Sequence, residues 1–302
     1  MMETTRLFIR ASRPLFLLGA ALVYSLGAGI AHYLGTPVNW NLYLLGQAWV
    51  TTLQLAAHYL NEYYDSPLDV ENPNRTPFSG GSGAVGPGKL PRTTMMLSSV
   101  ACLTLTASLT VLLLRDAKPS SATILIMVLS FLGAFFYSVP PIRLAATGYG
   151  ELTTSILVAN FLPAFAILLQ TGELHRLVAM STFPLIVVHL SMMLVFELPD
   201  YAVDVKTGKR TLLVRMGWHN GMTLHNSLIV SSYFLLALAV SFGMPFMIAL
   251  PALLTFPLGL LQIWQMRRLA AGAKPNWTAL TLTSVTLFIL MTYLLTYSYW
   301  TR

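Results

Sequence analysis

Apolar residues follow one another in long runs along most of the chain, and short polar stretches separate the runs. A run of about 20 predominantly apolar residues is long enough to cross a bilayer as a helix. The pattern therefore predicts an all-α, polytopic membrane protein with about nine transmembrane helices around a central cavity. The predicted helices are Pro14 to Gly35, Asn41 to Tyr64, Thr94 to Leu114, Ser120 to Tyr137, Glu151 to Gln170, Val178 to Leu198, Thr223 to Phe242, Met244 to Trp264 and Trp277 to Tyr299.

The composition agrees with a bilayer environment. Of the 302 residues, 55% are hydrophobic and only 10% are charged, whereas about a quarter of a soluble domain is charged. No polar block between the runs is long enough to fold separately, so we expect residues 1–302 to form a single transmembrane domain. Cys102 is the only cysteine, which excludes an intramolecular disulfide and a cysteine-based metal cluster.

The basic residues are distributed unevenly between the two ends of the predicted helices. If the nine helices alternate in direction, fourteen of the 18 Lys and Arg residues fall on one side of the membrane. That side should be cytoplasmic, and the N-terminus lies on it. We expect the membrane to be the plasma membrane of a bacterium or archaeon. The same asymmetry explains the net charge of +7 without any nucleic-acid partner.

Acidic residues collect at the predicted cytoplasmic end of the second helix. Residues 61–69 read Asn-Glu-Tyr-Tyr-Asp-Ser-Pro-Leu-Asp. A spacing of four advances a helix by only about 40° per step, so Asn61, Asp65 and Asp69 form one oxygen-bearing stripe. Such a stripe suits a hard cation, although Pro67 is expected to loosen the turn that carries Asp69.

A second acidic cluster follows the sixth predicted helix, at the same end. Asp200 and Asp204 again share one helical face, and basic residues follow them. Neighbouring carboxylates at a membrane boundary are costly unless a cation lies between them, and this ligand set favours Mg²⁺ shared with a phosphate. Lys209, Arg210 and Arg143 are candidates to hold the remaining phosphate oxygens by charge-assisted hydrogen bonds.

Together the two clusters resemble the motifs of a known family. The pattern Asn61-Glu62-x-x-Asp65-x-x-x-Asp69 resembles the first motif of the UbiA superfamily of intramembrane prenyltransferases, normally Asn-Asp-x-x-Asp-x-x-x-Asp. Asp200-x-x-x-Asp204, followed by Gly-Lys-Arg-Thr-Leu at residues 208–212, resembles the second. The nine-helix pattern also fits, so the resemblance covers nearly the whole chain.

The resemblance implies a fold, an activity and a set of site residues. It implies Mg²⁺-dependent transfer of a polyprenyl group from its diphosphate to an aromatic acceptor. It also implies a metal–diphosphate site at Asn61, Asp65, Asp69, Asp200 and Asp204, with Tyr137 and Arg143 similar to the tyrosine and basic residue that follow the fourth helix in the family. Glu62 and Glu197 depart from the family pattern, which usually has Asp and often Asn at these positions.

The acceptor is suggested by a short segment after the fourth helix. The sequence Gly148-Tyr-Gly-Glu-Leu152 resembles the segment of 1,4-dihydroxy-2-naphthoate polyprenyltransferases, which act in menaquinone biosynthesis. Homogentisate, 4-hydroxybenzoate, a porphyrin and a glycerol phosphate lipid stay open as acceptors. A further alternative keeps the family but changes the chemistry. Departure of the diphosphate leaves an allylic cation, and water or an internal double bond of the donor would trap it instead of an aromatic ring.

Other polar features leave further alternatives. Residues 79–88 contain Gly81-x-Gly83-x-x-Gly86, but no strand precedes this loop, which argues against a dinucleotide site. The loop is either a flexible connector or a lid, and Arg75 and Lys89, which flank it, are candidates to bind the diphosphate. His58 and His189 lie in the helices that carry the motifs and either face the cavity or belong to the core. Acidic residues repeated in two halves also occur in cation-coupled transporters, so a transporter remains an alternative.

Overall fold

The computed structural model describes the backbone of residues 2–69 and 72–302, and the regular elements in this part of the chain are all helices. The prediction of an all-α protein is confirmed. The elements are α1 Met2–Ala11, α2 Pro14–Tyr33, α3 Trp40–Asp69, α4 Arg92–Asp116, α5 Ser121–Ser138, η1 Leu144–Ala146, α6 Gly150–Ile156, η2 Leu157–Phe161, α7 Leu162–Thr171, α8 Arg176–Glu197, α9 Tyr201–Thr207, α10 Leu212–Met216, α11 Trp218–Ser241, α12 Phe246–Leu253, α13 Phe256–Ala270 and α14 Trp277–Trp300.

All nine predicted runs are helical, but the count of nine membrane spans is not confirmed. Within the described residues, seven helices are long and apolar enough to cross a bilayer, and the bent pair α12–α13 makes up to eight. The helix α3 is not among them, because polar residues such as Gln47, Gln54 and His58 interrupt its apolar sequence. These helices confirm an integral membrane protein, whereas its orientation stays a prediction.

Two of the predicted helices are irregular near a proline. The eighth bends by 41° between α12 and α13, where Pro257 occupies one of the first two positions of α13 and has no N–H to continue the hydrogen-bond ladder. The fifth is continuous but contains a π-helical turn, η2, between α6 and α7, and Pro163 follows that turn.

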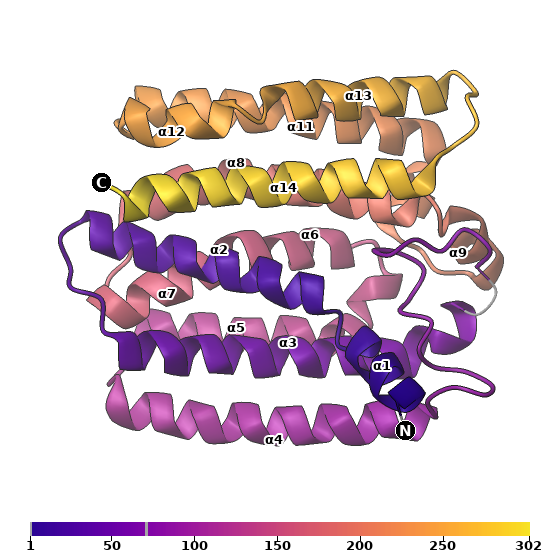
Figure 1. Ribbon diagram of the computed structural model, residues 1–302, viewed down its shortest axis with the longest axis horizontal. Coiled ribbons are helices and arrows are strands. Elements are labelled where there is room, and N and C mark those ends of the chain that lie inside the picture. Colours follow the sequence, from indigo (N-terminus) through magenta and orange to yellow (C-terminus); the bar gives the residue numbers. More distant parts are fainter. Residues whose placement is uncertain (1, 70–71) are drawn as a thin grey trace.

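The long helices run side by side, as Figure 1 shows, and their connections gather at the two ends of the bundle. The short helix α1, the loop after α3 and the helix α9 lie at one end, and the C-terminus lies at the other. The main apolar core lies where α2, α7, α8 and α14 meet. The structure thus brings the ends of α3 and α8, which carry the two acidic clusters, to one end of the bundle.

Candidate active site

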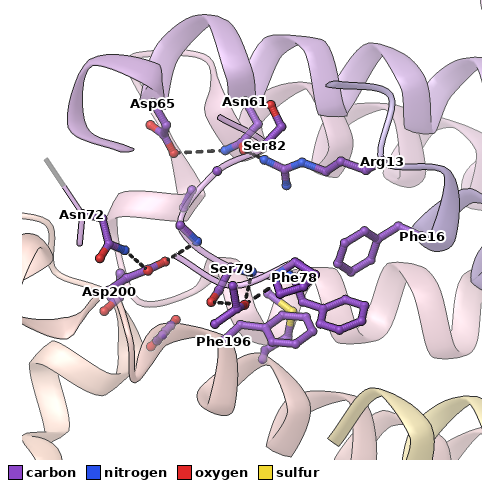
Figure 2. Close-up of a pocket in the computed structure, with 18 of the residues that line it drawn as sticks. Arg13, Phe16, Asn61, Asp65, Asn72, Phe78, Ser79, Ser82, Phe196 and Asp200 are labelled. Carbon is purple, nitrogen blue, oxygen red and sulfur yellow. Dashed lines mark hydrogen bonds between the residues drawn. The ribbon is translucent and has the colours of Figure 1, made fainter. Parts of the chain in front are cut away.

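A polar cavity of about 280 Å³ lies at the end of the bundle where α1, the loop after α3 and α9 gather. Its wall includes Asn61 and Asp65 from α3, Asp200 at the start of α9 and Asp204 within α9. Figure 2 shows Asp65 and Asp200 on the same side of this space. The two acidic clusters therefore converge on one cavity, as the sequence predicts, and do not point to opposite membrane surfaces.

Asp65 is the most heavily engaged of these carboxylates. It is 5% exposed and accepts a hydrogen bond from the Asn61 amide one helical turn earlier, at 3.0 Å. The Arg143 guanidinium lies 2.7 Å from one carboxylate oxygen and the Lys209 ammonium 3.2 Å from the other. Two cations from distant segments thus balance a single buried carboxylate.

Asp200 and Asp204 lie one turn apart, and the N–H of Asp204 donates to the carbonyl of Asp200 at 2.9 Å. The Asp200 carboxylate accepts hydrogen bonds from the side chain of Asn72 and from the N–H of Gly80, the latter at 3.1 Å. The pKa of Asp204 is raised to about 6, mainly by burial and also by the nearby Asp65 carboxylate, against the lowering effect of Lys209. A divalent cation at Asp204 would relieve this unfavourable charge.

The residues present fit Mg²⁺ that is shared with a phosphate. Among the described residues, no three His, Cys, Asp or Glu side chains come close enough together to hold a metal by themselves. Mg²⁺ needs no such cage, because it usually keeps several waters and binds through one or two carboxylates together with substrate phosphates. The side chain of Asp69, a further predicted ligand, lies outside the described residues.

The two glutamates that depart from the family pattern accept hydrogen bonds from backbone N–H groups of other segments. Glu62 is 1% exposed and accepts from Arg13 at 2.7 Å, from the N–H of Ser82 at 3.0 Å and from the Ser82 hydroxyl at 2.7 Å. Glu197 accepts from the N–H of Leu213 at 3.0 Å, and its carboxyl lies near that of Glu151. The extra methylene of Glu62 is what lets its carboxylate reach the loop after α3.

The loop after α3 is folded against the site. Five of its glycines adopt positive φ, among them Gly80 and Gly83, a conformation that other residues rarely take. The Arg75 side chain donates to the carbonyl of Gly80 at 2.7 Å, and Lys89 donates to the carbonyl of Gly83 at 2.8 Å. These contacts argue against a flexible connector, and Arg75 and Lys89 hold the loop in its observed conformation.

The remaining predicted residues lie around the site. Tyr137 and Lys209 line the polar cavity. Arg143 contacts Asp65, which lines the cavity, by an ion pair of 2.7 Å. The backbone N–H of Arg210 donates to the carbonyl of Ala146 at 3.1 Å. Arg143, Arg210, Arg75 and Lys89 are not among the side chains that line the cavity.

A second, mainly apolar chamber of about 250 Å³ adjoins the polar cavity and extends between the helices. His58 and His189 both line it. The ring of His58 lies 3.0 Å from the carbonyl of Ser12, and the ring of His189 lies 3.0 Å from the Ser155 hydroxyl. Each histidine therefore both faces a cavity and is satisfied by the core, so the two alternatives for these residues are not exclusive.

Several site residues lie outside the two acidic motifs. Arg13, Asn72, Ser82 and Glu151 line the cavity, and only the fold shows that they do. Distinguishing them from other polar residues would have required knowledge of the contacts across the bundle.

Comparisons with known proteins agree with this geometry. The model of the UbiA prenyltransferase family matches residues 20–282. A 1,4-dihydroxy-2-naphthoate octaprenyltransferase from Bacillus subtilis is 24% identical over 172 residues, which cover 57% of this chain and 54% of that protein. The match thus spans about half the length of that relative.

Solved structures share the fold over almost the entire chain. A UbiA homolog from Archaeoglobus fulgidus, bound to DMAPP and Mg²⁺, superimposes with a TM-score of 0.69 at 17% identity and covers 95% of this chain and 98% of its own. A digeranylgeranylglyceryl phosphate synthase superimposes with a TM-score of 0.63 at 17% identity over 99% and 98% of the two chains. Because the family model matches most of its length, the chain belongs to the UbiA prenyltransferase family.

Proposed function

We propose that the protein transfers a polyprenyl group from its diphosphate to an aromatic acceptor in a Mg²⁺-dependent reaction within the membrane. The observation that carries this proposal is the pair of adjoining spaces, one polar and acidic, the other apolar. Together they match a donor with a charged head and a hydrocarbon tail. The family supports the chemistry, and the Archaeoglobus fulgidus relatives bind DMAPP or GPP together with Mg²⁺.

The oxygen-bearing side chains of the two motifs are the proposed metal site. We assign the metal to Asn61, Asp65, Asp69, Asp200 and Asp204. Bound Mg²⁺ supplies positive charge that favours departure of the diphosphate. Lys209 contributes a second charge on the cavity wall, while Arg143 keeps Asp65 ionised and oriented by its 2.7 Å contact. Arg75, Arg210 and Lys89 act on the diphosphate only by positioning the segments that surround it.

In the proposed reaction, the chamber holds the prenyl chain so that the first carbon of the donor lies at the boundary between the two spaces. The carbon–oxygen bond breaks, and its electron pair leaves with the diphosphate. A ring carbon of the acceptor then attacks the allylic cation, and that carbon loses either a proton or its carboxylate as CO₂, which returns the bonding electron pair to the ring. The protein contributes orientation, electrostatic stabilisation of the leaving group and exclusion of water.

For the acceptor we propose 1,4-dihydroxy-2-naphthoate, which would place the enzyme in menaquinone biosynthesis. Two observations support this choice: the segment Gly148–Leu152 and the naming of the Bacillus subtilis relative. The excess of basic residues at the end that carries the site supports a cytoplasmic active site.

An acceptor panel tests the proposal. Purified protein in lipid nanodiscs receives Mg²⁺, geranylgeranyl diphosphate and one acceptor at a time, namely 1,4-dihydroxy-2-naphthoate, homogentisate, 4-hydroxybenzoate, a porphyrin or glycerol phosphate lipid. Mass spectrometry identifies the products. We expect the prenylated naphthoquinol; a product with another acceptor would replace the naphthoate assignment. Absence of any prenyl transfer, with ion uptake into proteoliposomes, would favour the transporter.

The metal site is tested by Asp65→Asn and Asp200→Asn. Each change keeps the side-chain shape but removes the charge that holds the cation, so we expect prenyl transfer to fall about 10²- to 10³-fold. Asp116→Asn is the matched control, because Asp116 is exposed and pairs with Arg115 at the end of α4, away from the cavity. Activity within about tenfold of the parent for both site variants would contradict the metal role.

A further inference from the structure

Three phenylalanine rings form the boundary between the polar cavity and the apolar chamber. Phe16 comes from α2, Phe78 from the loop after α3 and Phe196 from α8, and each lines both spaces. The centroid of Phe16 lies 6.2 Å from that of Phe78 and 6.0 Å from that of Phe196, and both pairs meet edge to face. Phe78 and Phe196 are stacked at 6.2 Å. We call these three rings the aromatic collar.

A tight turn fixes the position of Phe78 in the collar. The Thr76 hydroxyl accepts hydrogen bonds from the N–H groups of Phe78 and Ser79 at 3.1 and 3.0 Å. The N–H of Thr76 in turn donates to the carbonyl of Ser79 at 3.1 Å, and Pro77 restricts φ within the turn. The ring of Phe78 is therefore presented from a preorganised turn.

The same loop is fastened to both acidic clusters. The N–H of Gly80 donates to Asp200 at 3.1 Å, and Ser82 donates twice to Glu62, at 3.0 and 2.7 Å. Figure 2 shows Phe16, Phe78 and Phe196 grouped on one side of the cavity and Asp65 and Asp200 on another. The position of the Phe78 ring thus depends on Asp200, which is proposed to bind the metal, and on Glu62, the neighbour of Asn61 in the first motif.

This placement defines what the collar faces during the reaction. If the diphosphate lies among the carboxylates and the prenyl chain lies in the chamber, the carbon between them passes through the collar. The face of an aromatic ring attracts a cation. A hydrocarbon ring also offers no hydrogen-bond partner to a water molecule, which needs two to four polar neighbours to reside in a cavity.

We propose that the aromatic collar, with Phe78 as its loop-borne member, stabilises the allylic cation and keeps water away from it. This inference rests on the proposed prenyl transfer. The cation has two fates. Attack by an acceptor carbon forms a carbon–carbon bond and releases a proton or CO₂ from that carbon. Attack by water forms a carbon–oxygen bond, releases one proton to solvent and yields the prenyl alcohol. The collar selects the first fate.

The test separates loss of the ring face from loss of bulk. Phe78→Leu keeps most of the volume but removes the π-system, Phe78→Trp keeps an aromatic face, and Phe78→Ala opens the boundary. Phe196→Leu repeats the first change on the rigid helix α8. Phe234→Leu is the control, since Phe234 is 63% exposed on the outer face of α11. Each monodisperse variant is incubated in nanodiscs with Mg²⁺, geranylgeranyl diphosphate and the acceptor that the parent prenylates, in ¹⁸O-labelled water.

Two quantities are measured for each variant: the rate of diphosphate release and the ratio of ¹⁸O-labelled prenyl alcohol to prenylated acceptor. For Phe78→Leu and Phe196→Leu, we expect diphosphate release to slow roughly two- to thirtyfold, the range of a desolvated cation–π contact. The rate of diphosphate release in Phe78→Trp should stay closer to the parental rate than that in Phe78→Leu. Phe78→Ala should raise the alcohol ratio several-fold, whereas Phe234→Leu should change neither quantity.

The outcomes distinguish this inference from the proposed function. A parent protein that prenylates no acceptor would refute the proposed function itself. A parent that is active, with both leucine variants at the parental rate and ratio, would overturn the role of the collar alone. If Phe78→Ala does not fold, the two leucine variants decide the question by the same measurements.

Discussion

The loss of charge at Glu62 should release the loop that carries Phe78, and Glu62→Gln tests this. Gln keeps the shape of the side chain, so the change acts on the three donors that now meet a carboxylate, namely Arg13 and the two groups of Ser82. Hydrogen bonds to a charged group contribute about 1.5–3 kcal/mol, against about 0.5–1.5 for neutral pairs. The change therefore weakens each contact by about 1 kcal/mol.

The summed effect is smaller than three such terms. The Arg13 side chain is 23% exposed, so water replaces part of its lost interaction, and Asn61 still accepts from the same guanidinium nitrogen at 2.9 Å. We expect a net loss of about 1–2 kcal/mol in closing the loop, which corresponds to about a 5- to 30-fold fall in kcat/KM for the prenyl diphosphate. Most of it should appear as a higher KM, because the loop must be ordered when the donor binds.

Glu62→Asp separates the two functions of this carboxylate. Aspartate is the usual residue of the family motif at this position, and it keeps the negative charge near Arg13 while withdrawing by one methylene from Ser82. Hydrogen exchange of residues 79–90 should therefore rise in both variants, but only Glu62→Gln should also lower thermal stability through Arg13. Glu173→Gln, in the exposed turn between α7 and α8, is the control. Parental exchange and a kcat/KM within about twofold for Glu62→Gln would refute the reasoning.

Three further predictions concern Asp204 and the packing of α2 against α7. The pKa of Asp204, raised to about 6 from 3.8, predicts that the proton competes with Mg²⁺ there, so titration calorimetry should show about tenfold weaker Mg²⁺ binding at pH 5 than at pH 8. Because the pKa of Asp204 is higher in the folded state than in the unfolded state, the folded protein binds this proton more tightly. The metal-free protein should therefore lose stability as the pH rises from 3.8 through about 6 and the proton leaves. Gly27→Ala should lower the free energy of unfolding by roughly 1–3 kcal/mol, since an added Cβ would collide with the carbonyl oxygen of Pro163 where α2 meets α7. Gly19→Ala is its control, because there the added Cβ meets only the terminal methyl of Ile289 at 3.2 Å, and equal melting temperatures for the two variants would contradict the close-approach argument.

The sequence was sufficient for features whose physical signal is local. Long apolar runs predict helices because the bilayer offers no partner for an open backbone, and all nine runs are helical. Because an α-helix has about 3.6 residues per turn, residues four apart lie on one face. The spacing of Asn61 and Asp65, and that of Asp200 and Asp204, therefore predicts two polar helical faces. Even the bend between α12 and α13 has a local signal in Pro257, although the pattern alone indicates one uninterrupted run.

The features that escaped prediction depend on contacts between distant segments. The helices α9 and α10 have seven and five residues, too short to form without tertiary packing. The two glutamates carry the same charge as the motif aspartates, and only the placement of Ser82 and Leu213 shows that they bind backbone groups instead of a metal. Phe78 and Phe196 are two of 15 phenylalanines, so composition gives no reason to single them out.

The charges around the polar cavity also determine how a donor can enter. Carboxylates outnumber cations on its wall, with Asp65, Glu151, Glu197, Asp200 and Asp204 against Arg10, Arg13 and Lys209. A bare diphosphate would add negative charge to this excess, and repulsion between like charges is strongest where burial lowers the effective dielectric constant. A divalent cation must therefore accompany the diphosphate, because the cation offsets the negative charge that otherwise excludes the leaving group. The acidic excess thus makes binding of the leaving group conditional on the ion that assists its departure.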